Sequence, residues 1–286
     1  MVRITIPNTE PEITYFLDDR LKKNLDRQIE NLDKKDKDFL MVVDGREGSG
    51  KSTLSLQIGK YVDNTLDLSR VCFTPEEFRQ AIFSATKGQC VIYDEAFTGL
   101  SSRSAVSKIN KMLVSLMMQM RQKNLFVIIV LPTFFQLDKY VAMFRAKSLL
   151  HVYENKGRRG YFLGFNHNKK KALYLKGTKE YTYRYVRTDF KGRFYGVFAL
   201  GGKDDKYRDK KGEALEKTES EPEQESKYRT QRKSLLVNWY LEKKEKEKMS
   251  QEAFCEYIKP FGIDLDRKSI SLMLVNARKT GEIARC

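Results

Sequence analysis

The sequence has few residues of the kinds that build disulfide frameworks and zinc sites. Its four cysteines include no C-x-x-C pair, and its only histidines are His151 and His167. Neither a disulfide framework nor a structural zinc site is therefore expected, and the cysteine usage indicates a cytosolic protein. The longest apolar run, residues 125–131, is far shorter than the ~20 residues that cross a bilayer, so membrane insertion is not expected.

Acidic residues are in short supply. There are 38 against 54 basic residues, and the formal net charge at pH 7 is +16. Such an excess favours a polyanionic partner, either nucleic acid or an anionic membrane surface, although a generally lysine-rich surface gives the same count. The excess is uneven, because residues 151–200 hold twelve basic and only three acidic residues among twelve aromatic ones. This uneven placement favours nucleic acid.

The first half of the chain alternates apolar strands with amphipathic helices. Apolar residues at helical spacing predict helices over 18–36, 51–61, 74–85, 104–122 and 137–145. Short apolar runs predict strands at 39–43, 71–73, 90–94, 125–131 and 148–153. Strands that alternate with helices form a mainly parallel sheet covered on both faces. We therefore expect an α/β fold, with a core over 38–155 after an N-terminal extension and helix over 1–37.

A phosphate-binding sequence follows the first of the core strands. Residues 45–52 match G-x-x-x-x-G-K-S, and they stand between an apolar strand and an amphipathic helix. The glycines let several N–H groups turn inward, and the helix adds the positive end of its dipole. Lys51 is expected to reach the β- and γ-phosphates, and Ser52 to bind Mg²⁺. The residues predicted to cradle ATP are Gly45, Glu47, Gly48, Ser49, Gly50, Lys51, Ser52 and Thr53.

Two acids follow another apolar strand. Residues 90–93 lead directly into Asp94 and Glu95. A carboxylate at the carboxyl end of a neighbouring parallel strand can bind the magnesium ion, so Asp94 is predicted to be a metal ligand. Glu95 is predicted to polarise the attacking water. Solvent-exposed acids at a strand end are the alternative, but beside a P-loop the pair favours hydrolysis of ATP over phosphate transfer to a small acceptor.

Four further residues are candidates for the catalytic step. Thr133 follows the strand at 125–131, so its hydroxyl can contact the γ-phosphate or orient the water, or it can cap the next helix. Arg121 ends the long helix, Arg145 ends the short one, and Arg103 follows the acids. Each arginine can stabilise transition-state charge in a neighbouring subunit, and a surface position or a salt bridge is the alternative.

Three segments follow the core. Residues 156–200 alternate aromatic and polar residues, as at 181–185, which predicts a basic module of antiparallel hairpins that either contacts DNA or is an ordinary sheet. Its candidate contacts are Lys156, Arg158, Arg159, Lys169, Lys170, Lys171, Arg184 and Arg187. Residues 201–230 have almost no large apolar groups and predict a solvated linker.

Residues 231–286 predict a small helical domain. Its helices are expected at 234–243, 251–258 and 267–277, in an arrangement compatible with a helix-turn-helix. The last helix joins basic residues such as Arg267, Lys268 and Arg278 to an apolar face that includes Leu272 and Val275, as a recognition helix does. A helix that only packs on the ATPase core is the alternative.

The order of these motifs resembles a known group of ATPases. The P-loop, the strand with Asp-Glu-Ala, the helix that ends in Met-Arg-Gln-Lys-Asn, and the segments at 136–145 and 151–153 are similar to the FtsK–HerA branch of the additional-strand P-loop ATPases, with Zot-like phage proteins nearest in pattern. The resemblance covers about 38–155. It implies a RecA-like core, a homo-oligomeric ring that is often a hexamer, and movement or packaging of DNA driven by ATP in a prokaryotic cell or a phage-infected host.

The chain departs from that group in two places. Leu131, Pro132 and Thr133 stand where many members have glutamine, and a polar stretch stands where Zot-like proteins carry a membrane span. The second departure favours a soluble DNA motor, or a terminase-like packaging ATPase without a nuclease, because no acidic cluster of a metal-dependent nuclease is seen.

The sequence thus supports several functions that differ in class. The leading hypothesis is a DNA-dependent ATPase that translocates, packages or remodels DNA. The main alternative is an ATP-switched DNA-binding adaptor of the helicase-loader or transposition-regulator type. A nucleotide or small-molecule kinase and a non-enzymatic virion protein are further alternatives, and the Asp94–Glu95 pair and the complete phosphate site argue against them.

Overall fold

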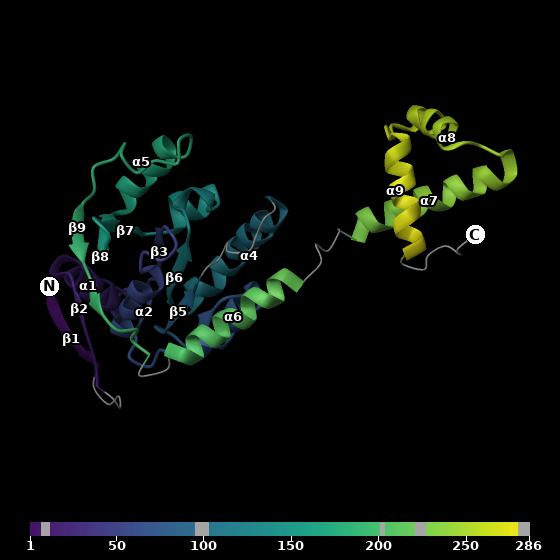
Figure 1. Ribbon diagram of the computed structural model, residues 1–286. Coiled ribbons are helices and arrows are strands. Elements are labelled where there is room, and N and C mark those ends of the chain that lie inside the picture. The colour runs from purple at the N-terminus through teal and green to yellow at the C-terminus, as the bar shows by residue number, and fades with distance from the viewer. Residues whose placement is uncertain (7–11, 95–102, 201–203, 221–226, 280–286) are drawn as a thin grey trace. The chain divides into compact units, whose positions relative to one another are not determined.

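The computed structural model describes residues 1–6, 12–94, 103–200, 204–220 and 227–279 (Figure 1). The chain divides into two compact units, Met1–Glu219 and Ser220–Cys286. The first unit contains the sheet and the phosphate-binding sequence, and the second is helical.

A seven-stranded sheet forms the centre of the first unit, with the strand order β4-β5-β6-β3-β7-β8-β9. The strands from β4 to β7 pair in parallel, and β8 and β9 continue the sheet in antiparallel pairing. Their bounds are β3 Phe39–Gly45, β4 Val71–Cys72, β5 Cys90–Tyr93, β6 Phe126–Leu131, β7 Ser148–Asn155, β8 Arg158–Phe165 and β9 Phe190–Arg193. The predicted α/β fold with a mainly parallel sheet is confirmed.

Helices cover both faces of the sheet, because the side chains of each strand point alternately to opposite sides. In β3, Leu40 and Val42 enter one apolar core, while Met41 and Val43 enter the other. Helices α3 Pro75–Ser84, α4 Arg103–Gln122 and α5 His167–Gly177 contribute to the first core. Helices α1 Asp19–Lys34 and α2 Lys51–Val62 contribute to the second. The core strands are therefore buried on both faces, which explains why their sequences are continuously apolar.

Helix α3 begins where the sequence predicts it. The Thr74 hydroxyl accepts a hydrogen bond from the Glu77 N–H at 3.2 Å, and Pro75 occupies the first helical turn. The Glu77 carboxylate reaches back to the Phe73 N–H at 2.9 Å. These contacts satisfy donors that a helix start leaves without intrahelical partners.

The N-terminal segment forms a hairpin that the sequence analysis missed. Strands β1 Val2–Ile6 and β2 Ile13–Leu17 pair antiparallel, and β10 Tyr195–Gly196 pairs with β2 to complete a second, three-stranded sheet. Tyr15 on β2 is fully buried, and its hydroxyl donates to the carbonyl oxygen of Gln57 on α2 at 2.8 Å. The hairpin therefore supports the helix that follows the phosphate loop.

The basic module contains a helix as well as hairpins. Strands β7, β8 and β9 form the predicted antiparallel pairs, but residues 167–177 are helix α5, which begins at Asn166 with a side-chain cap to the Lys169 N–H. Residues 181–185 are not a strand, although their aromatic and polar residues alternate. Only Tyr183 of the three tyrosines there points into the protein, where it bonds to Asp44.

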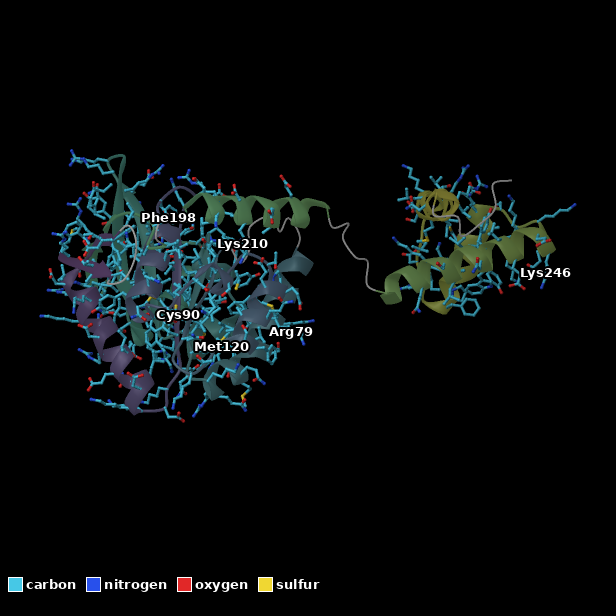
Figure 2. The ribbon with its side chains drawn as sticks, turned by 90° about the horizontal axis from the view of Figure 1, so that it is seen from below. Arg79, Cys90, Met120, Phe198, Lys210 and Lys246 are labelled. Atoms are coloured by element: carbon cyan, nitrogen blue, oxygen red, sulfur yellow. The ribbon has the colours of Figure 1, made fainter. Side chains whose placement is uncertain are left out.

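The predicted linker is largely helical. Helix α6 spans Asp204–Ser220 at the end of the first unit, and both Tyr207 and Ala214 are buried. Lys210 donates to the carbonyl oxygens of Leu68 at 3.0 Å and Val71 at 2.6 Å. Figure 2 labels Lys210 on this helix, with Phe198 nearby. The linker prediction failed because α6 has too few apolar residues to form a helical pattern in the sequence. Polar contacts such as those of Lys210 also hold this helix on the core.

The second unit contains the three predicted helices, α7 Lys227–Glu247, α8 Gln251–Ile258 and α9 Arg267–Lys279. Its core includes Phe254 and Ile258 of α8 together with Ile270, Leu274 and Ala277 of α9. Of the four apolar residues expected on one face of the last helix, Ile270 is buried in this core and Met273 packs against it, whereas Leu272 and Val275 are exposed. Residues 259–266 connect α8 to α9, which is longer than the 3–4-residue turn of a helix-turn-helix.

The search for membrane spans among the described residues found no helix with the length and apolar character needed to cross a bilayer.

Candidate functional site

The phosphate loop forms a cradle that requires glycine at its two ends. Gly45 has a φ of +143°, and a Cβ atom there would lie 2.1 Å from the carbonyl oxygen of Val152 on β7. Gly50 has a φ of +100° and directly precedes α2. Larger residues at these positions are strained, and at Gly45 they also collide with the neighbouring strand. The loop therefore closes between β3 and α2 as its sequence predicts.

Lys51 lies folded over this loop. Its side chain is 8 % exposed, and its Nζ donates to the carbonyl oxygen of Arg46 at 2.9 Å. The two residues sit at opposite ends of the loop, so the ammonium group spans the cradle. A cation in this position is close to where the loop would hold phosphate oxygens.

The first turn of α2 carries further oxygen and nitrogen groups that suit a phosphate and a hard cation. Gly50 provides no side chain to cap the helix start, and Ser52 and Thr53 are half-buried in its first turn. Ser49 is 1 % exposed, and its hydroxyl oxygen has no hydrogen-bond partner among the described residues. An uncapped helix start beside a buried, unpartnered hydroxyl fits an anion in the cradle.

Asp94 lies at the same edge of the sheet as the phosphate loop. It directly follows β5, which is separated from β3 by β6 alone. Ile129 of β6 pairs with Tyr93 of β5 on one side and with Val42 of β3 on the other, so Tyr93 and Val42 lie at the same height in the sheet. Val42 stands three residues before the end of β3. Two strand spacings separate the axes of β5 and β3 by about 10 Å. The carboxylate of Asp94 and the hydroxyl of Ser52 are the oxygen donors that Mg²⁺ prefers, so these residues fit the ion.

Asp94 is also bound to helix α6. Its side chain is 1 % exposed, and Oδ2 accepts a hydrogen bond from the Tyr207 hydroxyl. The Tyr207 ring packs between Phe73 and Phe198, with centroid distances of 5.2 Å to each. Nothing in the sequence pattern points to Tyr207, because it is a lone aromatic residue in a polar segment.

A second buried acid ends β3. Asp44 is completely buried and paired with Leu131 on one side and His151 on the other. Its Oδ1 lies 3.0 Å from His151 Nδ1, and its Oδ2 accepts from the Tyr183 hydroxyl and from the Phe134 N–H at 2.8 Å. The sequence offered one signal for this acid, a charge at the end of an apolar strand just before the loop.

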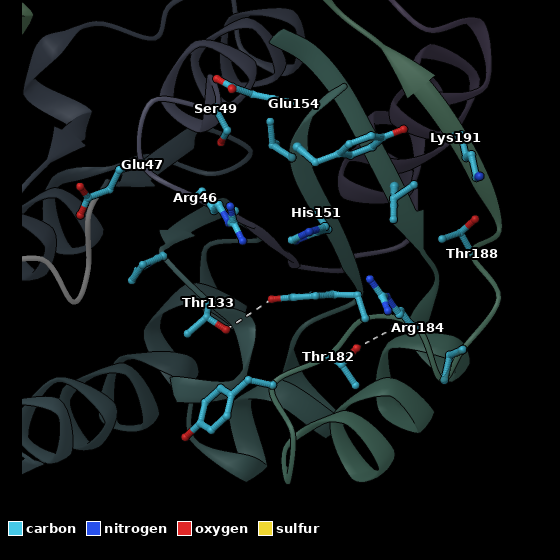
Figure 3. A pocket seen from close by; sticks show the side chains of 18 of the residues that line it. Arg46, Glu47, Ser49, Thr133, His151, Glu154, Thr182, Arg184, Thr188 and Lys191 are labelled. Carbon is cyan, nitrogen blue, oxygen red and sulfur yellow. Dashed lines mark hydrogen bonds between the residues drawn. The ribbon is translucent and has the colours of Figure 1, made fainter. Parts of the chain in front are cut away.

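A pocket with a volume of about 890 Å³ opens beside the loop (Figure 3). Loop residues Arg46, Glu47 and Ser49 form one wall, and the floor includes Thr133, His151 and Tyr183. Arg184, Arg187 and Lys191 bring further positive charge from the basic module. The volume suits a small molecule or part of a nucleotide. The pocket therefore joins the phosphate loop to residues 181–191.

Thr133 faces this pocket instead of capping the next helix. Its hydroxyl lies 3.4 Å from the Tyr183 hydroxyl, and it makes no side-chain cap to the short helix Phe134–Gln136. The capping alternative is therefore wrong, and a role at the γ-phosphate remains a prediction.

The two arginine candidates at helix ends lie near the opposite edge of the sheet. Arg145 donates to Asp38 at 2.6 Å and to the Met117 carbonyl oxygen at 3.2 Å, and Asp38 directly precedes β3. Arg121 lies in the last turn of α4, five residues before the start of β6 at Phe126. The structure therefore gives Arg145 a structural ion pair, and it brings neither arginine to the loop of its own chain. Glu95 and the side chain of Arg103 lie outside the described residues.

Arg159, which the sequence predicted only to be a DNA contact, lies over the phosphate loop. The guanidinium of Arg159, on β8, is 3.6 Å from where a Cβ of Gly48 would lie. Arg159 is largely exposed and pairs with Glu154 at 3.1 Å. Its place above the loop makes it a candidate contact for a phosphate of the same subunit.

Three lysines that were predicted to contact DNA interact with other residues of the protein instead. Lys169 pairs with Asp189 at 2.8 Å, and the ammonium group of Lys171 lies 5.0 Å from the centre of the Phe144 ring. Lys170 is completely buried and donates to the carbonyl oxygens of Ala142 and Met143. Burial lowers the pKa of Lys170 to about 8. The predicted DNA contact by Lys170 is therefore wrong.

Metal chemistry beyond the loop finds no support among the described residues, which contain no group of three or more histidine, cysteine, aspartate or glutamate side chains able to hold an ion. The three cysteines in that part of the chain, Cys72, Cys90 and Cys255, are buried and unpaired.

Comparison of the chain with protein-family models gives no match, and comparison with curated proteins gives none either. Its function is therefore inferred from the geometry of the site.

Proposed function

We propose that the chain is an ATP hydrolase of the additional-strand P-loop type that uses ATP to act on DNA. The observation that carries this proposal is the cradle between β3 and α2, in which Gly45 and Gly50 adopt positive φ angles and Lys51 spans the loop. A loop of this shape at a helix start is suited to bind phosphate through N–H groups and a cation.

The strand order supports membership of the additional-strand group. Strand β6 lies between β3, which leads into the loop, and β5, which leads into Asp94. A parallel strand inserted between these two is the feature after which the group is named. The antiparallel strands β8 and β9 extend the sheet beyond β7, so the basic module continues the core.

The roles of the residues follow from their places. Lys51 would exchange the Arg46 carbonyl oxygen for phosphate oxygens, while Ser52 and Asp94 would hold Mg²⁺. The bound ion would neutralise charge on the β- and γ-phosphates. Glu95 is proposed to polarise the attacking water, since it directly follows Asp94 in the sequence.

Nucleic acid is the proposed partner because exposed cations gather on two elements. Arg158, Arg159, Arg184 and Arg187 are exposed in the basic module. In the second unit, α9 exposes Lys268, Leu272 and Val275 along one side, while its buried residues lie on the other. A helix that exposes both cations and apolar groups can contact phosphates and bases. A homo-oligomeric ring is part of the proposal, as the resemblance implies.

The proposal is tested by the ATPase rate with and without single- and double-stranded DNA. Lys51→Ala should lose nucleotide binding, and Glu95→Gln should bind ATP without turning it over. Lys87→Ala is a matched control, because this lysine is exposed and only pairs with exposed Asp36 at 3.5 Å. Its rate should equal that of the wild type.

The DNA arm separates a motor from an ATP-switched adaptor. Rapid turnover that DNA stimulates supports the motor, whereas slow hydrolysis with ATP-dependent DNA binding supports the adaptor. If wild type and Lys51→Ala bind ATP equally, the P-loop assignment is wrong. If ATP is hydrolysed but no DNA complex forms at low salt, the DNA role must be abandoned.

A further inference from the structure

The contact between Asp44 and His151 fixes how the histidine ring presents its two nitrogens. The carboxylate of Asp44 accepts from Tyr183 and Phe134 through one oxygen and lies 3.0 Å from His151 Nδ1 through the other. A carboxylate carries no proton and can only accept hydrogen bonds. Nδ1 of His151 must therefore carry a proton, and Nε2 is the nitrogen that remains for another partner.

The histidine ring is held in place on the floor of the pocket. The Tyr183 ring stacks on it with 3.7 Å between centroids, and the side chain keeps 19 % of its surface exposed. In the view of Figure 3, Arg46 and Arg184 flank His151, and Thr133 lies below it. Asp44 holds Nδ1 of His151, and the Tyr183 ring covers one face of the imidazole. A ligand can therefore contact the imidazole in one direction only, at Nε2.

The side chains that line the pocket favour an anion. The pocket receives cations from the loop, from residues 184 and 187, and from β9, namely Arg46, Arg184, Arg187 and Lys191. The acids that line the pocket are Glu47 and Glu154. A metal ligand role for His151 has no support, since no group of three ligating side chains occurs in the described part of the chain.

The phosphate loop identifies which anion reaches the pocket. Gly45, Arg46 and Ser49 line both the cradle and the pocket, so a phosphate chain held by the loop borders this space. His151 is paired with Asp44, one residue before the loop begins. The N–H groups of a P-loop cradle the α- and β-phosphates, so we expect a third phosphate to extend beyond them.

We propose that His151, oriented by Asp44, contacts the terminal phosphate of a nucleoside triphosphate and thereby distinguishes ATP from ADP. This inference rests on the proposed function of the loop. In its protonated form the ring donates through Nδ1 to Asp44 and through Nε2 to a phosphate oxygen, with the second proton taken from solvent. Asp44 and Tyr183 act as positioning residues, because they hold the ring without touching the nucleotide.

The test compares the binding of a non-hydrolysable ATP analogue with that of ADP, measured by calorimetry in the presence of Mg²⁺. His151→Gln should weaken binding of the triphosphate about 10-fold or more, as expected when a hydrogen bond to a charged group is lost, and leave ADP within twofold. His167→Gln is the matched control, because His167 contacts the Ala146 carbonyl oxygen and does not line the pocket. It should change neither affinity.

The outcomes separate this inference from the function on which it rests. Lys51→Ala should weaken both nucleotides, which tests the loop alone. Equal weakening of ATP analogue and ADP by His151→Gln, or no weakening of either, overturns the role of His151. If the wild type binds neither nucleotide, the loop assignment and the histidine proposal fail together.

A second measurement needs no variant, because the chain contains only two histidines. In nitrogen NMR spectra of the free protein, both histidines should be protonated at Nδ1, because the Ala146 carbonyl oxygen that faces His167 Nδ1 can only accept. The response to nucleotide is what identifies His151. Its Nε2 signal should shift with the triphosphate analogue and stay unchanged with ADP, while His167 serves as the internal reference. A shift of equal size with both nucleotides contradicts the proposal.

Discussion

Two buried aspartates at the same edge of the sheet are held in different ways. Asp44 ends β3 and accepts from Tyr183, Phe134 and His151, all of which lie around the pocket. Asp94 follows β5 and accepts from Tyr207, which belongs to the helix that ends at the boundary with the second unit. One buried acid thus positions side chains that surround the pocket, whereas the other connects the site to helix α6.

The largest expected effect is on stability, and it separates the two acids. Asp44→Ala leaves three donors without their acceptor, and loss of one partner in a buried charged network costs about 3–5 kcal/mol. Asp94→Ala removes the acceptor of Tyr207 and should cost about 1–2 kcal/mol. Urea unfolding of both variants measures the difference. Equal losses would mean that Asp44 is not the more deeply integrated acid.

A buried base extends the comparison, because Lys170 is bound by carbonyl oxygens and its pKa is lowered to about 8 by burial. Between about pH 8 and its ordinary value of 10.5, the unfolded chain binds more protons than the folded protein. The unfolding free energy should therefore rise with pH in this window, by at most about 3 kcal/mol.

Lys170→Met should abolish this rise, and chemical unfolding at several pH values between 8 and 10.5 measures it. Lys171→Met is the control, because this neighbouring lysine rests on the Phe144 ring and is only partly buried. A rise of the same size in Lys170→Met as in the wild type would show that another group titrates.

The two tyrosines should differ in their effect on magnesium. Tyr207→Phe removes the donor that holds the proposed metal ligand Asp94, and loss of such a supporting contact weakens metal binding by about 10-fold or more. Tyr183→Phe affects an acid that is not expected to bind the ion. The Mg²⁺ concentration for half-maximal ATPase rate should therefore rise in the first variant alone. A similar rise in both would remove the distinction between the two acids.

The smallest effect concerns Tyr183 at alkaline pH. Burial, followed by the charge of Asp44 and the hydrogen bond to it, raises the pKa of Tyr183 well above its ordinary value of 10. The stability from this neutral tyrosine is present below pH 10 and is lost as pH rises above it, because only the unfolded chain then ionises. Tyr183→Phe should lose about 1 kcal/mol at neutral pH and show a shallower decline above pH 10. An unchanged decline in unfolding experiments would contradict this.

The core was predictable from the sequence because its signals are local. Apolar runs gave the parallel strands, and Thr74, Pro75 and Glu77 marked the start of α3. The same applies to the loop, whose glycines and Lys51 form one motif. These features depend on neighbours within a few positions, and such neighbours are visible in a sequence.

Contacts between distant residues were not predictable. Tyr183 is 139 positions from Asp44, and Tyr207 is 113 positions from Asp94. Tyr183 stands in an alternating segment that was predicted to be a strand, and Tyr207 in a polar segment that was predicted to be a linker. Neither pattern indicates that the tyrosine hydroxyl bonds to a buried acid. Helix α6 was missed for a related cause, since Tyr207 is held by Asp94 and Lys210 by the carbonyl oxygens of Leu68 and Val71, and not by an apolar stripe.

The packing of Gly45 against Val152 has a consequence for the order in which the protein can become functional. The cradle is bounded by a carbonyl oxygen more than one hundred residues downstream of the loop. A nascent chain that has emerged only as far as α4 carries the entire phosphate motif but lacks β6 and β7, the two strands that flank β3. The motif becomes a binding site only after both strands have been synthesised and have paired.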